Sequence, residues 1–140
     1  MSSAAKNDCQ NLVDEWLNFA TQMLEEHGEF IPYACAMNLA GEIGSYAADT
    51  GDEHPNSQEV ISLLKSGFRE QKGSLKCTAI FYDVVIRNPE KMDAVAVQLD
   101  HKDNYSNIVI FPYQITDEVV QYGAALLNAG TNDIFGTTQK

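Results

Sequence analysis

Basic residues are scarce in the first part of this 140-residue chain. Residues 1–60 contain 11 Asp and Glu but only one basic residue, Lys6, and the whole chain has a net charge of −11. Phosphate backbones and anionic lipid surfaces repel such a chain, so we expect neither nucleic-acid nor membrane-surface binding. Residues 61–140 are nearly balanced, with 9 acidic and 8 basic residues. The N-terminal acidity either serves solubility or forms an acidic face for a basic protein partner.

The chain also lacks long apolar runs and paired cysteines. No apolar span approaches 18 residues, and the N-terminus MSSAAKNDCQ does not follow the basic-then-apolar order of a secretory signal. Cys9, Cys35 and Cys77 are far apart and form no CxxC pair, and free thiols in apolar runs behave as small hydrophobic groups. We therefore expect a cytoplasmic protein in a reducing compartment.

Sequence motifs for cofactors and metals are missing as well. There is no G-x-G-x-x-G pattern and no P-loop. The loop from Asp49 to His54 also contains Asp52 and Glu53, but its spacing matches neither an EF-hand nor a zinc site. We interpret it as a solvated loop, with cation binding as the alternative, and we expect no cofactor and no metal.

Two further residues could carry chemistry. His101 follows Asp100 at the end of a predicted strand, and a His–Asp pair can orient a general base. Asp83 lies within an apolar strand, where burial would raise its pKa. No serine or cysteine nucleophile stands out beside His101, so we expect a non-catalytic protein. The alternative is a small-molecule sensor or enzyme with a pocket between sheet and helix near Asp83 and His101.

Hydrophobic periodicity and turn residues predict three helices and five strands. Asn7 is expected to cap the first helix and Gly28 to end it. The next element is a hairpin of residues 30–38 and 43–48 around Gly41, in which Pro32 indicates either an edge strand or a position early in the strand. A helix over residues 56–73 follows, with Asn56 or Ser57 as its predicted cap and with a buried apolar stripe of Val60, Ile61, Leu64 and Phe68. Strands over residues 75–87, 93–101 and 105–113 follow, and Thr116 is expected to cap a third helix over residues 117–130.

The order α-β-β-α-β-β-β-α predicts one α+β domain over residues 1–140, with flexible ends at residues 1–6 and 136–140. Its short connections predict a five-stranded antiparallel sheet. The order is similar to the profilin-like and roadblock-like architectures, which implies the strand order 2-1-5-4-3 but no function. Both strand faces are fairly apolar, so a homodimer that buries the open sheet face or an edge strand is a further possibility. The basic stripe of the second helix is interpreted as a solvated face, or as a contact for the acidic half of a neighbouring subunit; it consists of Lys65, Arg69, Lys72 and Lys76.

The segment HGEFIPYACAMNLAGEIGSY, residues 27–46, is followed later by a strand that ends in IVIFPY. Together they resemble a group of small uncharacterised bacterial proteins with a GEF-x-P-[YF]-[AG] strand, a GE turn and a terminal PY strand. Some of these proteins occur in toxin-immunity neighbourhoods. The resemblance therefore implies a protein-binding, immunity-type inhibitor, and it implies no catalytic residues.

Partner-binding residues are predicted on and after this hairpin. Glu29 and Glu42 flank it and are expected to be exposed recognition groups, while tyrosines could be interface anchors or core residues. The predicted set is Glu29, Tyr33, Glu42, Tyr46, Asp52 and Glu53, and Tyr113 is a further candidate anchor.

Overall fold

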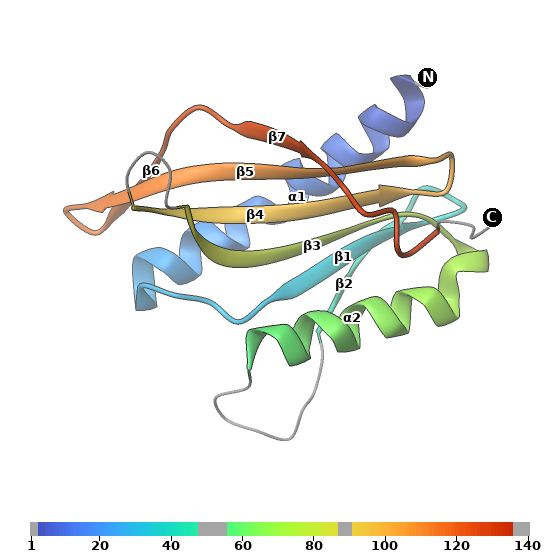
Figure 1. Ribbon diagram of the computed structural model, residues 1–140, viewed down its shortest axis with the longest axis horizontal. Helices are drawn as coiled ribbons and strands as arrows, with labels where there is room; N and C mark the ends of the chain where they lie inside the picture. Colours follow the sequence, from blue (N-terminus) through green and yellow to red (C-terminus); the bar gives the residue numbers. More distant parts are fainter. Residues whose placement is uncertain (1–2, 48–55, 87–90, 136–140) are drawn as a thin grey trace.

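The computed structural model describes residues 3–47, 56–86 and 91–135, which form helices on both faces of an antiparallel sheet (Figure 1). The order of the sheet is β2-β1-β3-β4-β5-β6, and β7 also pairs with β5. The α+β class and the antiparallel sheet are thus confirmed. No helix among the described residues is long and apolar enough to cross a bilayer. The elements are α1 (Ser3–His27), β1 (Tyr33–Asn38), β2 (Ile43–Tyr46), α2 (Ser57–Gln71), the 3₁₀ helix η1 (Lys72–Ser74), β3 (Leu75–Ile86), β4 (Met92–His101), β5 (Tyr105–Thr116), β6 (Val119–Tyr122) and β7 (Leu126–Ala129).

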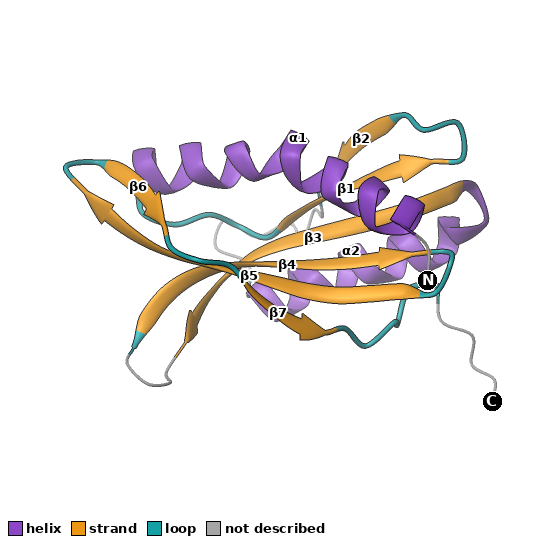
Figure 2. Cartoon of the chain, turned by 90° about the horizontal axis from the view of Figure 1, so that it is seen from above, coloured by secondary structure: helices purple, strands orange, loops and turns teal. Residues whose placement is uncertain are grey.

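The strands divide the interior into two cores, because successive side chains of a strand point to opposite faces of the sheet. One core joins α1 to the odd-numbered residues of β1, β3 and β4, and the other joins α2 to even-numbered residues of β1 and β3. Figure 2 shows the two helices with the sheet between them. The first core includes Leu12, Leu24, Cys35, Phe81 and Val97, and the second includes Ala34, Val60, Phe68, Ile80 and Ile134.

The helix α1 begins earlier than its predicted cap. It starts at Ser3, so Asn7 lies inside the helix, and the predicted cap is wrong. Alanines at positions 4 and 5 favour this extension, because alanine has the highest helix propensity. The predicted end is confirmed: Gly28 has φ +78°, and its N–H donates to the carbonyl of Leu24 at 2.9 Å.

The β1–β2 hairpin turns where the sequence predicts, with Gly41 at φ +91°. The side chain of Asn38 shapes this turn, since its Oδ1 accepts hydrogen bonds from the backbone N–H groups of Ala40 and Glu42, both at 2.9 Å. The strand β1 lies between β2 and β3 and is therefore not an edge strand. Pro32 directly precedes β1, where its missing N–H removes no hydrogen bond from the ladder.

The helix α2 is capped by Asn56, one of the two predicted candidates. Its side chain accepts from the N–H groups of Gln58 (2.9 Å) and Glu59 (3.3 Å). The predicted apolar stripe of this helix is buried, and the helix ends at Gln71, before Gly73. The basic stripe is not simply a solvated face. Three of its four members pair with acidic residues of the same chain: Lys65 and Arg69 with Asp133 at 2.9 and 3.8 Å, and Lys76 with Asp8 at 3.8 Å.

The predicted third helix is wrong, because residues 119–122 and 126–129 form strands instead. Asp117 and Glu118 have φ values of +54° and +66°, and the register pairs Thr116 with Val119. Such a two-residue turn with two positive φ values matches the twist of a hairpin. The chain therefore folds back along β5, and β-branched and aromatic side chains of β6 favour the strand.

The predicted strand order 2-1-5-4-3 is also wrong. β6 and β7 occupy the outer edge of β5, where the prediction placed β1. β1 pairs instead with β3, in the register of Ala34 with Ile80 and Ala36 with Thr78. The sheet thus differs from the profilin-like and roadblock-like arrangement that the sequence suggested.

Candidate functional site

The predicted partner-binding residues do not form one surface. Glu29 is exposed just after the C-terminal end of α1, whereas Glu42 is exposed in the hairpin turn, which lies toward the N-terminal end of α1 (Figure 2). Tyr33 and Tyr46 point to opposite faces of the sheet, because they pack in different cores. Asp52 and Glu53, with the whole loop from Asp49 to His54, lie outside the described residues.

Tyr33 and Tyr46 both pack against core residues. Tyr33 is only 7% exposed, its ring stacks on Phe81 at 4.8 Å, and its hydroxyl donates to the carbonyl of Trp16 at 2.7 Å. Burial raises the pKa of Tyr33. Tyr46 packs edge-on against Phe68 at 5.2 Å. Of the two roles that the sequence left open, core packing explains Tyr33, and it accounts for one ring contact of the half-buried Tyr46.

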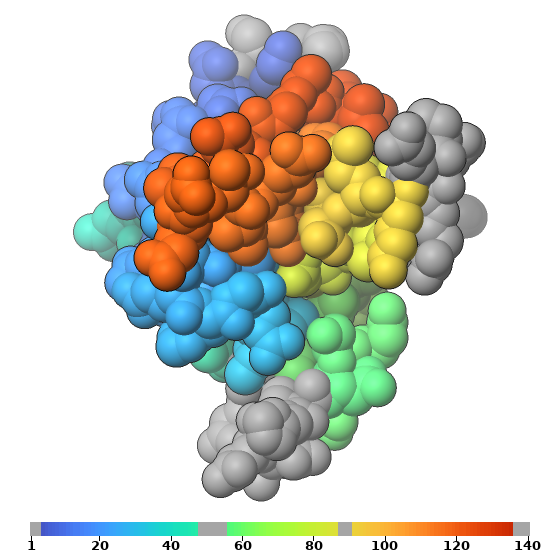
Figure 3. All heavy atoms as spheres, turned by 90° about the vertical axis from the view of Figure 1, so that its left-hand side faces the viewer, coloured from blue at the N-terminus to red at the C-terminus, as the bar shows by residue number. Residues whose placement is uncertain are grey.

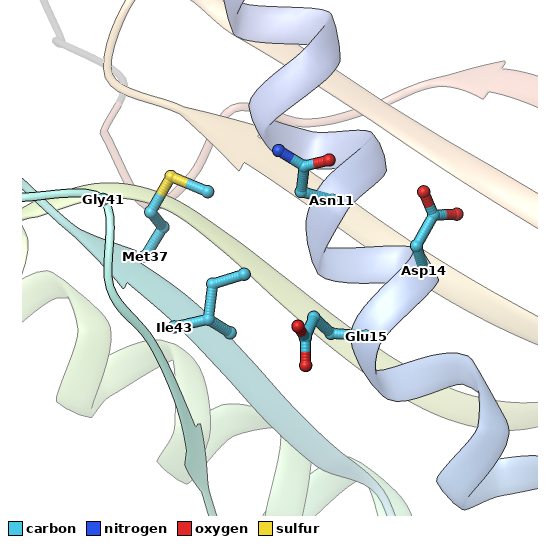
Figure 4. A pocket seen from close by; sticks show the side chains of 6 residues that line it. All are labelled: Asn11, Asp14, Glu15, Met37, Gly41 and Ile43. Atoms are coloured by element: carbon cyan, nitrogen blue, oxygen red, sulfur yellow. The ribbon is translucent and has the colours of Figure 1, made fainter.

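A groove between α1 and the β1–β2 hairpin brings acidic and apolar residues together. It is a surface hollow of about 310 Å³, lined by Asn11, Asp14, Glu15, Met37, Gly41 and Ile43. Figure 4 shows Glu15 projecting from α1 toward Ile43 and Met37, which come from the hairpin strands. Met37 is 3% exposed and forms the apolar floor. We call this hollow the acidic groove.

Carboxylates line the acidic groove without cationic partners. Asp14 accepts a hydrogen bond from the side chain of Gln10 at 2.9 Å, and Glu42, next to Gly41, accepts one from Asn38 at 2.8 Å. None of the ion pairs found among residues 3–47, 56–86 and 91–135 involves Asp14, Glu15 or Glu42. The nearby acidic residue Asp8 differs, because it contacts both His101 and Lys76. The groove therefore keeps its negative charge available to a ligand.

The C-terminal end of α1 is fixed to β6, so its acidic residues have different roles. The Glu25 carboxylate accepts the N–H of Val120 at 3.0 Å, and the hydroxyls of Thr21 and Tyr122 lie 2.6 Å apart. Figure 3 shows this end of the molecule, where α1 in blue lies against the orange residues of β5 and β6. Glu25 is therefore part of the structure that holds α1 on the sheet.

Asp83 and His101 lie too far apart to share one pocket. In the β3–β4 register Asp83 opposes Val95, whereas His101 opposes Cys77, six residues away along β3. At about 3.3 Å per residue this separation is roughly 20 Å. Neither residue lines the acidic groove or two further hollows, one beside Tyr46 and Phe68 and the other beside Pro112 and Tyr122.

Each of these two residues has a structural partner. The Tyr113 hydroxyl donates a hydrogen bond to the carboxylate of Asp83 at 2.9 Å. Burial raises the pKa of Asp83, although the hydrogen bond from Tyr113 opposes this effect. His101 is 1% exposed and contacts Asp8 rather than Asp100, because neighbouring residues of a strand point to opposite faces of the sheet.

A buried polar row on the α2 side of the sheet was not predicted. Asp100 is completely buried and accepts hydrogen bonds from Ser106 (2.8 Å) and Gln98 (3.3 Å). Gln98 also donates to Asp133 at 3.1 Å, in the C-terminal segment that crosses this face. Burial raises the pKa of Asp100 despite the two hydrogen bonds. Burial alone would also raise the pKa of Asp133, but the hydrogen bonds from Lys65 and Thr131 and the charges of Lys65 and Arg69 together outweigh it, and that pKa is lowered.

Comparison with protein-family models, curated protein sequences and solved structures finds no match for this chain. The geometry of the acidic groove is therefore the basis for assigning a function.

Proposed function

We propose that this chain is a non-catalytic protein-binding domain whose acidic groove holds a basic segment of a protein partner. The observation that carries this proposal is the combination in one hollow of two groove carboxylates, Asp14 and Glu15, with the apolar side chains of Met37 and Ile43. Glu42 adds a third exposed carboxylate beside the groove.

Lysine and arginine side chains match both parts of such a groove. Their methylene stems bury against apolar surface while the cationic head remains near water or a carboxylate. Here the stem would lie on Met37 and Ile43, and the head would reach Glu15 or Asp14. Because no described cation pairs with these carboxylates, binding would not have to break an existing ion pair.

The distribution of charge supports a basic partner over a neutral one. Apart from Lys6 and His27, α1 has no basic residue, and β1 and β2 have none. A field of one sign accelerates association with a partner of the opposite sign and weakens as salt screens it. The resemblance of residues 27–46 to proteins of toxin-immunity neighbourhoods makes a cytoplasmic, immunity-type inhibitor of a basic toxin our preferred form of this function.

A pull-down from the lysate of the source cell tests the proposal. The bait is the wild-type chain, and the test variant is Glu15→Lys/Glu42→Lys. The matched control, Glu26→Lys/Glu70→Lys, makes the same change in net charge at exposed residues outside the groove, in the last turns of α1 and α2, where a cation suits the helix dipole.

We expect a basic protein that wild type and control retain but the groove variant loses, and that is released at about 0.5 M salt because the Debye length falls to a few ångströms. Equal recovery with the groove variant and the wild type would refute the proposal. Loss with both double variants would indicate a response to net charge and would refute the assignment to the groove.

A further inference from the structure

One edge of the sheet is free of charge. Residues 119–132, which include β6 and β7, contain no Asp, Glu, Lys, Arg or His, although the chain as a whole carries −11. All four residues of β7 are exposed, and Leu126 and Leu127 are 48% and 65% exposed. This segment thus combines exposed apolar side chains with an absence of charge.

The outer side of β7 is a hydrogen-bonding edge that no other described strand occupies. β7 pairs only with β5 among the described residues, and Gly130 N–H donates to the carbonyl of Ser106 at 3.1 Å. Along an antiparallel ladder, hydrogen-bonded pairs alternate with non-bonded pairs. The backbone N–H and C=O groups of Leu127 and Ala129 therefore point away from β5.

Edge strands in stable monomers are commonly protected by very short length, a charge, a proline or a bulge. Of these, β7 has only its length of four residues. β7 has neither a charge nor a proline, and the register of its pairing with β5 is continuous. The other edges differ: β6 follows the acidic turn of Asp117 and Glu118, and β2 follows Glu42. Only β7 among the described edges lacks an adjacent acidic residue.

We propose that β7 pairs antiparallel with β7 of a second copy of this chain, which joins the two sheets into one across a two-fold axis. A register centred on Asn128 satisfies the outward groups, because Leu127 of each copy then forms a hydrogen-bonded pair with Ala129 of the other. The two Asn128 residues face each other as a non-bonded pair.

The absence of charge favours a second copy of this chain as the partner of the β7 edge. A symmetric contact brings the same patch of both copies together, so a charge within it would lie close to the like charge of the other copy. The absence of charge from residues 119–132 removes this repulsion, even though each copy is strongly acidic. A basic partner would instead be attracted to the acidic half of the chain, which lies elsewhere.

The contact leaves the acidic groove open. β2 and β7 lie at opposite edges of the sheet, so a dimer through β7 would present two grooves on its outer parts. The dimer therefore does not depend on the function proposed for the groove, and either can fail without the other.

Light scattering after size-exclusion chromatography tests the dimer. We expect wild type to show twice the 15.5 kDa mass of one chain. Leu127→Lys and Ala129→Lys should each give a monomer, because each places two like charges close together, as diagonal neighbours on one face of the joined sheet. Leu63→Lys is the matched control, as Leu63 is also exposed, at 43%, but lies on α2. Thermal unfolding of each variant confirms that it is folded.

Cross-linking tests the register independently. In an Asn128→Cys variant, the introduced thiols would face each other at a non-bonded pair, where Cα atoms lie about 4.5 Å apart, within the range for a disulfide. Oxidised glutathione is the oxidant: it accepts the two electrons and two protons of the thiols and yields two glutathione molecules and one intermolecular disulfide. Cys9, Cys35 and Cys77 are completely buried and give little background. Ser62→Cys, at an exposed position on α2, is the control.

The expected result is a covalent dimer that forms at least tenfold faster with Asn128→Cys than with Ser62→Cys. A monomeric wild type at concentrations up to about 1 mM, which corresponds to only about 4 kcal/mol of binding energy, would overturn the proposal. A dimer that persists in both β7 lysine variants, or cross-linking no faster than in the control, would overturn it as well.

Discussion

The imidazole of His101 and the carboxylate of Asp8 lie 2.9 Å apart, although 93 residues separate them in the chain. The other ring nitrogen, Nδ1, accepts the backbone N–H of Asp103 at 3.0 Å, so Nε2 carries the proton and donates to Asp8. The contact fixes the first turns of α1 to the end of β4. His101 is 1% exposed and thus contributes to structure.

Replacing Asp8 should destabilise the fold. In Asp8→Ala the buried N–H of His101 loses its acceptor, and Lys76 loses its ion pair. We expect the free energy of unfolding to fall by about 1–3 kcal/mol, the usual cost of an unsatisfied buried donor. Urea denaturation measures it, with Asp14→Ala, an exposed aspartate on the same helix, as the control. Equal losses in both variants would contradict the role assigned to this contact.

Asp100 should make the stability depend on pH. Gln98 and Ser106 donate hydrogen bonds to it, and the nearest other charged groups on this face are Lys65 and Asp133. Because burial raises the pKa of Asp100 above its usual value of 3.8, the folded state binds more protons than the unfolded state above about pH 3.8. The contribution of Asp100 titration to the free energy of unfolding is therefore complete below that pH. It is lost as the pH rises through the pKa of Asp100 in the folded state.

Asp100→Asn removes this titration. We expect the free energy of unfolding of the variant, relative to wild type, to increase between pH 4 and pH 7. The increase should be about 1.4 kcal/mol for each unit by which the pKa is raised. Asp83 shifts in the same direction but is present in both proteins, so it cancels in the difference. Urea denaturation at several pH values provides the measurement, and a difference that stays constant with pH, or falls, would show that the pKa of Asp100 is not raised.

Removal of the two hydroxyl groups beside Asp100, those of Ser106 and Thr78, should change the stability of the fold in different ways. Ser106 donates to Asp100 at 2.8 Å and accepts the N–H of Asn132 at 2.9 Å. Ser106→Ala therefore removes the acceptor of the Asn132 N–H and leaves Asp100 with the hydrogen bond from Gln98 alone. We expect a loss of about 1–3 kcal/mol. The hydroxyl of Thr78 is buried with no hydrogen-bond partner among the described residues, so Thr78→Val should be neutral or stabilising. Thermal unfolding compares them, and a larger loss in Thr78→Val would show that its hydroxyl has a partner.

Local signals predicted much of the fold. The Gly28 stop, the Gly41 turn and the Asn56 cap depend on residues within a few positions of each other, and all three are found. Strands β3, β4 and β5 follow from long apolar runs with short turns, and their positions agree with the prediction. The burial of the α2 stripe also follows from its helical spacing.

Non-local pairing explains most of the failures. The acidic groove joins Glu15 to Met37 and Ile43, and the buried row joins Gln98 to Asp133; neither combination has a spacing that identifies it. The sequence predicts one binding surface for Glu29 and Glu42 because they flank one hairpin, although Glu29 lies just after the end of α1. The strand order failed because it required β5 to have a free outer edge, and β6 and β7 occupy that edge.

The third helix predicted over residues 117–130 is wrong, and a substitution at its start distinguishes the observed hairpin from a helix. The alanines and leucines of this segment favour a helix. Asp117 and Glu118, however, have positive φ values, which residues other than glycine, asparagine and aspartate rarely adopt. Glu118→Gly should therefore stabilise the protein by about 0.5–1 kcal/mol, because glycine takes φ +66° without strain. Glu70→Gly, at an exposed position within α2, should destabilise it by about 1 kcal/mol. Both changes are measured by urea denaturation, and a loss of stability in Glu118→Gly similar to that in Glu70→Gly would place residue 118 in a helix and contradict the β5–β6 hairpin.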